Sequence, residues 1–67
     1  MIIEAIVVGF DEARGDGVVR DERGREFSFH CVNIADGTRR IDAGALVRAR
    51  RAVGLRGRDE VVDLVKL

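Results

Sequence analysis

Hydrophobic and polar positions in this 67-residue chain alternate in short runs and do not repeat at helical spacing. Residues 1–10 are mostly apolar and β-branched, and residues 26–30 and 45–51 alternate apolar and polar side chains with a period of two. Two more short runs, residues 18–20 and 61–65, are rich in valine. Both kinds of pattern are typical of β-strands. We therefore expect five strands and no helix of ten residues.

Turn-forming residues separate the predicted strands. Residues 15–17 (GDG), 21–24 (DERG) and 54–57 (GLRG) predict tight turns, and residues 33–44 predict a long loop with one helical turn. Five short strands without a helix predict a small closed barrel or a sandwich, formed by one domain over residues 1–67. Strict alternation places Arg51 inward beside Val47 and Ala49. We expect a strand bend there, or a guanidinium that reaches out at the end of the barrel.

Composition excludes several classes of protein. The chain is 46% hydrophobic and 36% charged, with a formal net charge of zero, which predicts a globular domain rather than a disordered polycation. No apolar run approaches the roughly 20 residues of a membrane-spanning helix, and we expect no signal peptide and no membrane partner. Cys31 is the only cysteine, so an internal disulfide is impossible and a reducing, cytoplasmic location is expected.

Charge is balanced over the whole chain but not along it. Residues 1–37 carry a net charge of −4, residues 38–58 carry +6, and residues 59–67 carry −2. Such asymmetry can mark a basic face. Alternatively, the arginines of the middle segment form a solvated strand surface that pairs with the acidic segment in three dimensions. The sequence leaves these two interpretations about equally supported.

The order of motifs resembles that of the bacterial cold-shock domain. Residues 9–19 (GFDEARGDGVV) are similar to the family motif W-F-N-x-x-K-G-F-G-F-I, and residues 27–34 (FSFHCVNI) are similar to V-F-V-H-F-S-A-I. Residues 42–47 (DAGALV) are similar to E-E-G-Q-x-V, and residues 64–67 (LVKL) to V-T-K-L. The resemblance covers the whole chain. It implies an all-β, five-stranded antiparallel Greek-key barrel of the OB type, and we expect a core that includes Phe10, Val19, Phe27, Phe29, Val47 and Leu64.

The resemblance also implies binding of single-stranded nucleic acid, which the family performs by stacking bases on surface aromatic rings. This chain departs from the family at those positions. The family's aromatic residues fall on Gly9, Asp16, Val18, Ser28, Cys31 and a position near Thr38, and two of its lysines fall on Ile6 and Val8. The family's binding pattern is matched at Arg14, His30 and Arg56. The chain is therefore identified as a divergent relative that lacks the stacking platform.

Two functions follow from these departures. The first is weak, low-specificity binding of single-stranded DNA or RNA by arginine electrostatics, with eight candidate residues: Arg14, His30, Arg39, Arg40, Arg48, Arg50, Arg56 and Arg58. The second is a protein-interaction or homodimerising module that has lost nucleic-acid binding and uses an aliphatic patch of Ile6, Val8, Val18 and Cys31. The chain would accordingly be a monomer or a homodimer.

We expect no catalytic site, cofactor or metal. His30 and Cys31 are adjacent potential ligands, but zinc requires three or four. Asp11 and Glu12 are adjacent, and the side chains of neighbouring strand or turn residues usually point apart, so they are not expected to form a catalytic carboxylate pair. Residues 15–17 are too short to cradle a phosphate and are better explained as a turn or a bulge.

Overall fold

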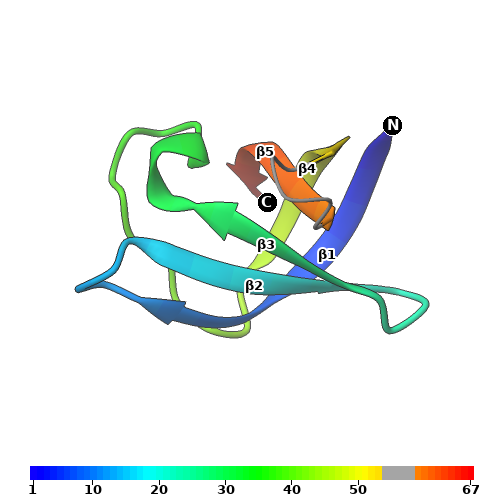
Figure 1. The fold of residues 1–67 in the computed structure, drawn as a ribbon, viewed down its shortest axis with the longest axis horizontal. Helices are drawn as coiled ribbons and strands as arrows, with labels where there is room; N and C mark the ends of the chain where they lie inside the picture. The colour runs from blue at the N-terminus through cyan, green and yellow to red at the C-terminus, as the bar shows by residue number, and fades with distance from the viewer. Residues whose placement is uncertain (54–58) are drawn as a thin grey trace.

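A computed structural model describes residues 1–53 and 59–67, apart from the side chain of Val53. The chain forms five strands and one short 3-10 helix, η1, which follows the third strand directly (Figure 1). The elements are β1 (Ile2–Asp11), β2 (Asp16–Asp21), β3 (Glu26–His30), η1 (Cys31–Asn33), β4 (Leu46–Val53) and β5 (Asp59–Lys66). The predicted turn at residues 54–57 lies outside the described residues.

The strands close into a barrel in the order β1-β2-β3-β5-β4, with β4 returning to β1. This confirms the all-β fold and favours the barrel over the sandwich. Four of the five pairings are antiparallel, but β3 and β5 run parallel, with Ser28 opposite Glu60. The antiparallel arrangement expected for the barrel therefore holds for four pairs of strands, and the pair β3 and β5 is the exception. Strand direction cannot alternate all the way round a ring with an odd number of strands, so one neighbouring pair must be parallel.

The strand β1 belongs to both sides of the barrel. Its first half pairs with β4 and its second half with β2, and Ile6 is opposite Leu46 on one side and Arg20 on the other. A bulge at Val8 shifts the register between Val7 and Gly9, so β1 bends where it passes from one partner to the other. Figure 1 shows β1 running beside β4 near the N-terminus and beside β2 farther along.

The core lies inside the barrel and draws on all five strands and the long connection between η1 and β4. Of the six residues predicted for it, five are buried: Val19, Phe27, Phe29, Val47 and Leu64. Phe10 is only partly buried, because it lies near the end of β1, where its ring stacks on Phe29 at a centroid distance of 5.9 Å. The connection adds Ile34 and Ile41, which the sequence pattern did not identify.

Arg51 continues the inward side of β4 and reaches out at the end of the barrel, as expected. Its guanidinium carbon lies 5.5 Å from the centre of the Phe27 ring, and its Nη2 lies 3.3 Å from Asp59 Oδ1. The side chain is half-buried. Its aliphatic stem therefore follows the core while the charge stays near solvent.

Candidate nucleic-acid interface

The outer surface of β1, β2 and β3 carries a row of small side chains. Gly9 is opposite Val18, and Val18 is opposite Ser28, so the three residues lie side by side on neighbouring strands. A Cβ added at Gly9 would meet no atom within 4 Å, and Val18 and Ser28 are half-buried. We call these three residues the flat strip. Its side chains present no ring and no charge, so it can hold a planar group only by weak contact.

Gly17 determines how closely β1 and β2 approach beneath this strip. A Cβ at Gly17 would lie 2.6 Å from the carbonyl oxygen of Gly9 and 2.6 Å from Cζ of Phe29. Such distances leave no room for a side chain. Glycine is therefore required at this position by packing, in a segment where the sequence suggested a turn or a bulge. The turn itself contains Gly15, which has a φ of 73°.

The loop between β1 and β2 brings two predicted binding residues to one end of the flat strip. The Asp11 carboxylate accepts hydrogen bonds from the backbone N–H groups of Ala13 and Arg14 at 3.0 and 3.2 Å, and this fixes the turn. The N–H of Cys31 donates to the Gly15 carbonyl at 2.7 Å, which ties the end of β3 to the same loop. Arg14 and His30 are both exposed there.

The long connection between η1 and β4 adds a third basic residue to this end. Arg40 Nε lies 3.2 Å from Oε1 of Glu12 in the β1–β2 loop, and both side chains are exposed. Its neighbour Arg39 has a φ of 60°, and its guanidinium has no carboxylate within ion-pair distance among the described residues. We call Arg14, His30 and Arg40 the loop cluster.

The remaining predicted arginines are not part of the loop cluster. Arg48 and Arg50 project from β4, where they form ion pairs at 2.9 Å with Glu4 of β1 and Asp63 of β5. Arg56 and Arg58 lie outside the described residues. Within the part of the chain that the structure describes, every arginine except Arg23 and Arg39 is paired with a carboxylate. In the described part of the basic middle segment, most arginines are thus paired with acidic residues from other parts of the chain.

These ion pairs hold the arginines only weakly. The paired side chains on the strand surfaces are about half exposed, and Arg14 is 75% exposed with its Nη2 3.5 Å from Asp16. Exposed ion pairs contribute about 0–1 kcal/mol each. An arginine can therefore turn from its carboxylate to a phosphate at small cost, although the carboxylate remains nearby and opposes the phosphate.

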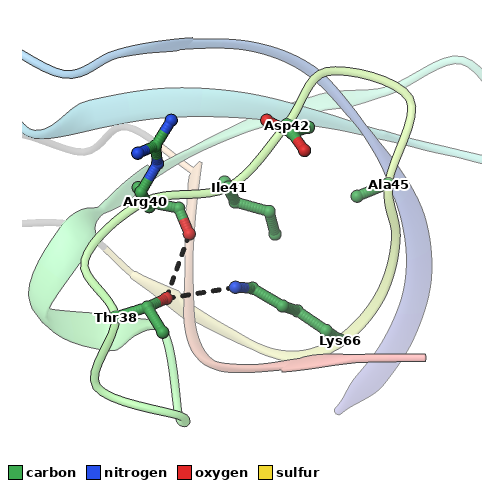
Figure 2. A pocket seen from close by; sticks show the side chains of 6 residues that line it. All are labelled: Thr38, Arg40, Ile41, Asp42, Ala45 and Lys66. Atoms are coloured by element: carbon green, nitrogen blue, oxygen red, sulfur yellow. Dashed lines mark hydrogen bonds between the residues drawn. The ribbon is translucent and has the colours of Figure 1, made fainter.

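A hollow of about 390 Å³ opens beside the long connection, lined by Thr38, Arg40, Ile41, Asp42, Ala45 and Lys66. Figure 2 shows Lys66 and Thr38 pointing toward each other, with Nζ donating to Oγ1 at 3.1 Å, while the Arg40 guanidinium points away. Lys66 Nζ also lies 2.9 Å from Asp36 Oδ2. This arrangement fastens the connection to the end of β5.

The same contacts change the acidity of Asp36. Hydrogen bonds from the Thr38 backbone N–H, from Lys66 and from the Thr38 hydroxyl lower the pKa of Asp36 to about 2. The polar groups of Asp36, Thr38 and Lys66 beside the hollow are therefore hydrogen-bonded to one another. The sequence pattern predicted only a long loop over residues 33–44 here, because the network depends on Lys66, which is distant from Asp36 in the sequence.

The four residues of the predicted aliphatic patch differ in exposure. Ile6 and Val8 are 44% and 40% exposed, but Val18 is half-buried in the flat strip. Cys31 is half-buried against the β1–β2 loop, with Sγ 3.9 Å from Nδ1 of His30. Ile6 also lies opposite Leu46 of β4, a residue that the patch prediction did not include. Leu46 precedes the buried Val47, so alternation alone would have shown it to point outward.

Comparisons with known proteins leave the family open. A scan against protein-family models finds none that matches this chain, and a search among curated proteins finds no match. Over residues 1–53 and 59–67, no helix is long and apolar enough to cross a membrane. In the same residues, no group of three or more His, Cys, Asp and Glu side chains is arranged to hold a metal ion.

Proposed function

We propose that the chain is a non-catalytic, weak and low-specificity binder of single-stranded nucleic acid, on a barrel of the OB and cold-shock type. The strand order β1-β2-β3-β5-β4 and the four motifs along the sequence support this assignment. Barrels of the OB type bind oligonucleotides across the surface of their second and third strands and the loop before the second strand. The proposed site of this chain lies in the same place.

One observation carries the proposal: the register of β1, β2 and β3 places the flat strip next to the loop cluster. Arg14 and Arg40 would contact phosphates, and His30 would lie beside the adjacent base. Bases would rest on Val18 and Ser28 without stacking on a ring. Each aromatic stack is worth about 1–3 kcal/mol, so its absence predicts weak binding that does not depend on base identity.

Binding through two arginines has a defined salt dependence. For single strands, log K falls with log salt by about 0.7 for each phosphate neutralised, so two contacts predict a slope of about −1.4. Between about 50 and 200 mM salt the affinity would fall by about sevenfold. Glu12 and Asp16 remain next to the phosphates and lower the affinity further.

The test is a fluorescence titration of a labelled single-stranded oligonucleotide at these two salt concentrations, with two matched charge-reversal variants. The double variant Arg14→Glu/Arg40→Glu alters the loop cluster, and Arg48→Glu/Arg50→Glu makes the same change in net charge on β4. We expect the first to reduce affinity at least tenfold and to remove the salt dependence. The second is expected to have a much smaller effect.

Three outcomes contradict the proposal. Equal losses in both variants would mean that net charge, and not the loop cluster, attracts the oligonucleotide. No binding by the parent at low salt would favour the alternative, a protein-interaction module that has lost nucleic-acid binding. Tight, salt-tolerant binding with a base preference would require a stacking site elsewhere.

A further inference from the structure

The outer surface of β1, β4 and β5 carries a row of aliphatic side chains away from the proposed nucleic-acid site. Ile6 is opposite Leu46, and the backbone N–H of Leu67 donates to the Leu46 carbonyl at 3.0 Å. The three side chains are 44%, 56% and 61% exposed. We call them the aliphatic row. Val8 and Val65, which are 40% and 49% exposed, lie two residues away along β1 and β5.

A row of opposite charges runs next to the aliphatic row. Glu4 is opposite Arg48, and Arg48 Nη2 lies 2.9 Å from Glu4 Oε2. The carboxylate therefore lies on β1 and the guanidinium on β4, one step along the strands from Ile6 and Leu46. Because directly opposite residues point to the same face, all four side chains project from one surface.

We infer that this surface binds a second copy of the chain, about a two-fold axis that runs parallel to the strands between β1 and β4. Such an axis places β1 of one copy over β4 of the other at the same height. Ile6 then packs on Leu46 of the second copy, and Glu4 faces Arg48 of the second copy. The pattern of apolar and charged groups is complementary to itself, as an isologous interface requires.

The neighbouring strand β2 also fits this arrangement. Arg20 is opposite Ile6 on the side away from Leu46, so the same axis places it over Leu67 of the second copy. A shallow hollow of about 190 Å³ lies there, and its lining includes Ile6, Arg20 and Leu46. Leu67 of the second copy would enter this hollow and cover the aliphatic stem of Arg20.

A second copy fits this surface better than a polyanion does. The exposed side chains of the aliphatic row offer no hydrogen-bond donor to a phosphate, and the ion pairs on both sides of it, Glu4 with Arg48 and Arg20 with Glu26, are neutral as pairs. A small specific interface of about 600 Å² per partner would cover about one eighth of the accessible surface of 4612 Å². Because this area is at the lower limit of specific interfaces, we expect association in the micromolar to millimolar range.

The experiment measures sedimentation equilibrium of the full chain from about 10 µM to about 1 mM, the range that such an interface requires. The variants Glu4→Arg and Arg48→Glu each place like charges against each other across the proposed axis. Each alone is expected to associate at least tenfold more weakly than the parent. Mixed in equal amounts they should associate again, because two arginines of one variant then face two carboxylates of the other.

Matched controls separate this geometry from general attraction between oppositely charged variants. Glu12→Arg and Arg14→Glu have the same net charges but change the β1–β2 loop, so their mixture should associate no more than the parent does. Leu46→Lys should abolish association, whereas Val32→Lys, at a residue that is 62% exposed in η1, should leave it unchanged. Circular dichroism of each variant confirms that the monomer is folded.

A parent that stays monomeric at about 1 mM overturns the inference. So does a mixture of Glu4→Arg and Arg48→Glu that associates no better than its components, since the two-fold arrangement requires the opposite. Association of the control mixture to the same extent would likewise overturn it, because charge alone would then explain the result.

Discussion

The flat strip and the aliphatic row lie on opposite halves of β1, and they differ in what is left unpaired. At the flat strip the side chains are small, and the two arginines at its end form exposed ion pairs with Asp16 and Glu12. At the aliphatic row the flanking charges pair across neighbouring strands, and the exposed groups are apolar. One strand, β1, therefore contributes to two surfaces of different chemical character, and the bulge at Val8 lies between Ile6 and Gly9.

The largest effect is expected from Phe29→Ala, because both surfaces rest on one core. Phe29 is 3% exposed and stacks on Phe10. Truncation of a buried phenylalanine costs about 3–5 kcal/mol, which is close to the whole stability of a small domain. Urea unfolding of the parent and the variant measures the loss. Phe10→Ala, at a partly buried ring, should cost clearly less; an equal or greater loss would contradict the placement of Phe10 at the barrel end.

Aromatic side chains restored on the flat strip sharpen the comparison next. The triple variant Gly9→Trp/Val18→Phe/Ser28→Phe places three rings on neighbouring strands, and Gly9 has open space for its new side chain. Two productive stacks of about 1–3 kcal/mol each would tighten binding of a single-stranded oligonucleotide at least tenfold. Titration with the labelled oligonucleotide measures the gain.

The matched control for the aromatic variant changes the other surface. Ile6→Phe/Leu46→Phe adds two rings to the aliphatic row and should leave oligonucleotide binding unchanged. If the triple variant folds but gains no affinity, the flat strip is not the binding surface.

Substitutions at two glycines test how closely β1 and β2 approach each other beneath the flat strip. Gly17→Ala should destabilise the protein by about 1–3 kcal/mol, because its Cβ would overlap the Gly9 carbonyl and the Phe29 ring. Gly9→Ala meets no atom within 4 Å and should change stability by less than about 0.5 kcal/mol. Thermal unfolding of the two variants gives the comparison. Equal effects would show that β1 and β2 do not approach as described.

The smallest effect concerns the long connection between η1 and β4, and it depends on pH. The pKa of Asp36 is about 2 in the folded protein, whereas the pKa of an ordinary aspartate carboxyl is 3.8. At pH values between these two, the folded chain therefore binds fewer protons at this group than the unfolded chain does. The stability that Asp36 contributes is therefore complete above pH 4 and is lost as the pH falls toward 2. Unfolding by urea at pH 5 and pH 2.5 measures this change.

Variants of the same network identify the cause of that pH dependence. Asp36→Asn should reduce the loss of stability between the two pH values, and Thr38→Val, which removes only the hydroxyl, should reduce it by a smaller amount. A pH dependence that is unchanged in Asp36→Asn would show that other carboxylates cause it.

The sequence predicted which segments form strands better than it predicted which strands lie next to each other. Apolar and alternating runs located all five strands, and five of the six named core residues are buried. Within an alternating run, inward and outward positions follow from the period of two along one strand. It did not show that β3 and β5 run parallel, since this follows from closing a ring of five strands. Phe10 was misplaced because a period of two does not reveal where the barrel ends.

The site was harder to predict for a related reason. Arg14 and His30 are brought together by one hairpin and its loop, so their proximity followed from local motifs. Arg48 is separated from them because it projects from β4 beside Glu4 of β1, a strand distant in the sequence. Arg50 projects from the same strand and pairs with Asp63 of the following strand, β5. Leu46 and Leu67 joined Ile6 for the same reason as Arg48 joined Glu4. Pairing between distant strands determines these neighbours, and no single segment encodes it.

The central claim, that nucleic acid and a second copy of the chain use different surfaces, is tested most directly by amide NMR. Unlabelled single-stranded oligonucleotide is added at low salt to the isotope-labelled protein at a concentration where it is monomeric. The account predicts shifts at Arg14, Val18, Ser28 and His30, with Leu46 and Leu67 unmoved. Shifts centred on Leu46 and Leu67, or no shifts at all, would contradict it.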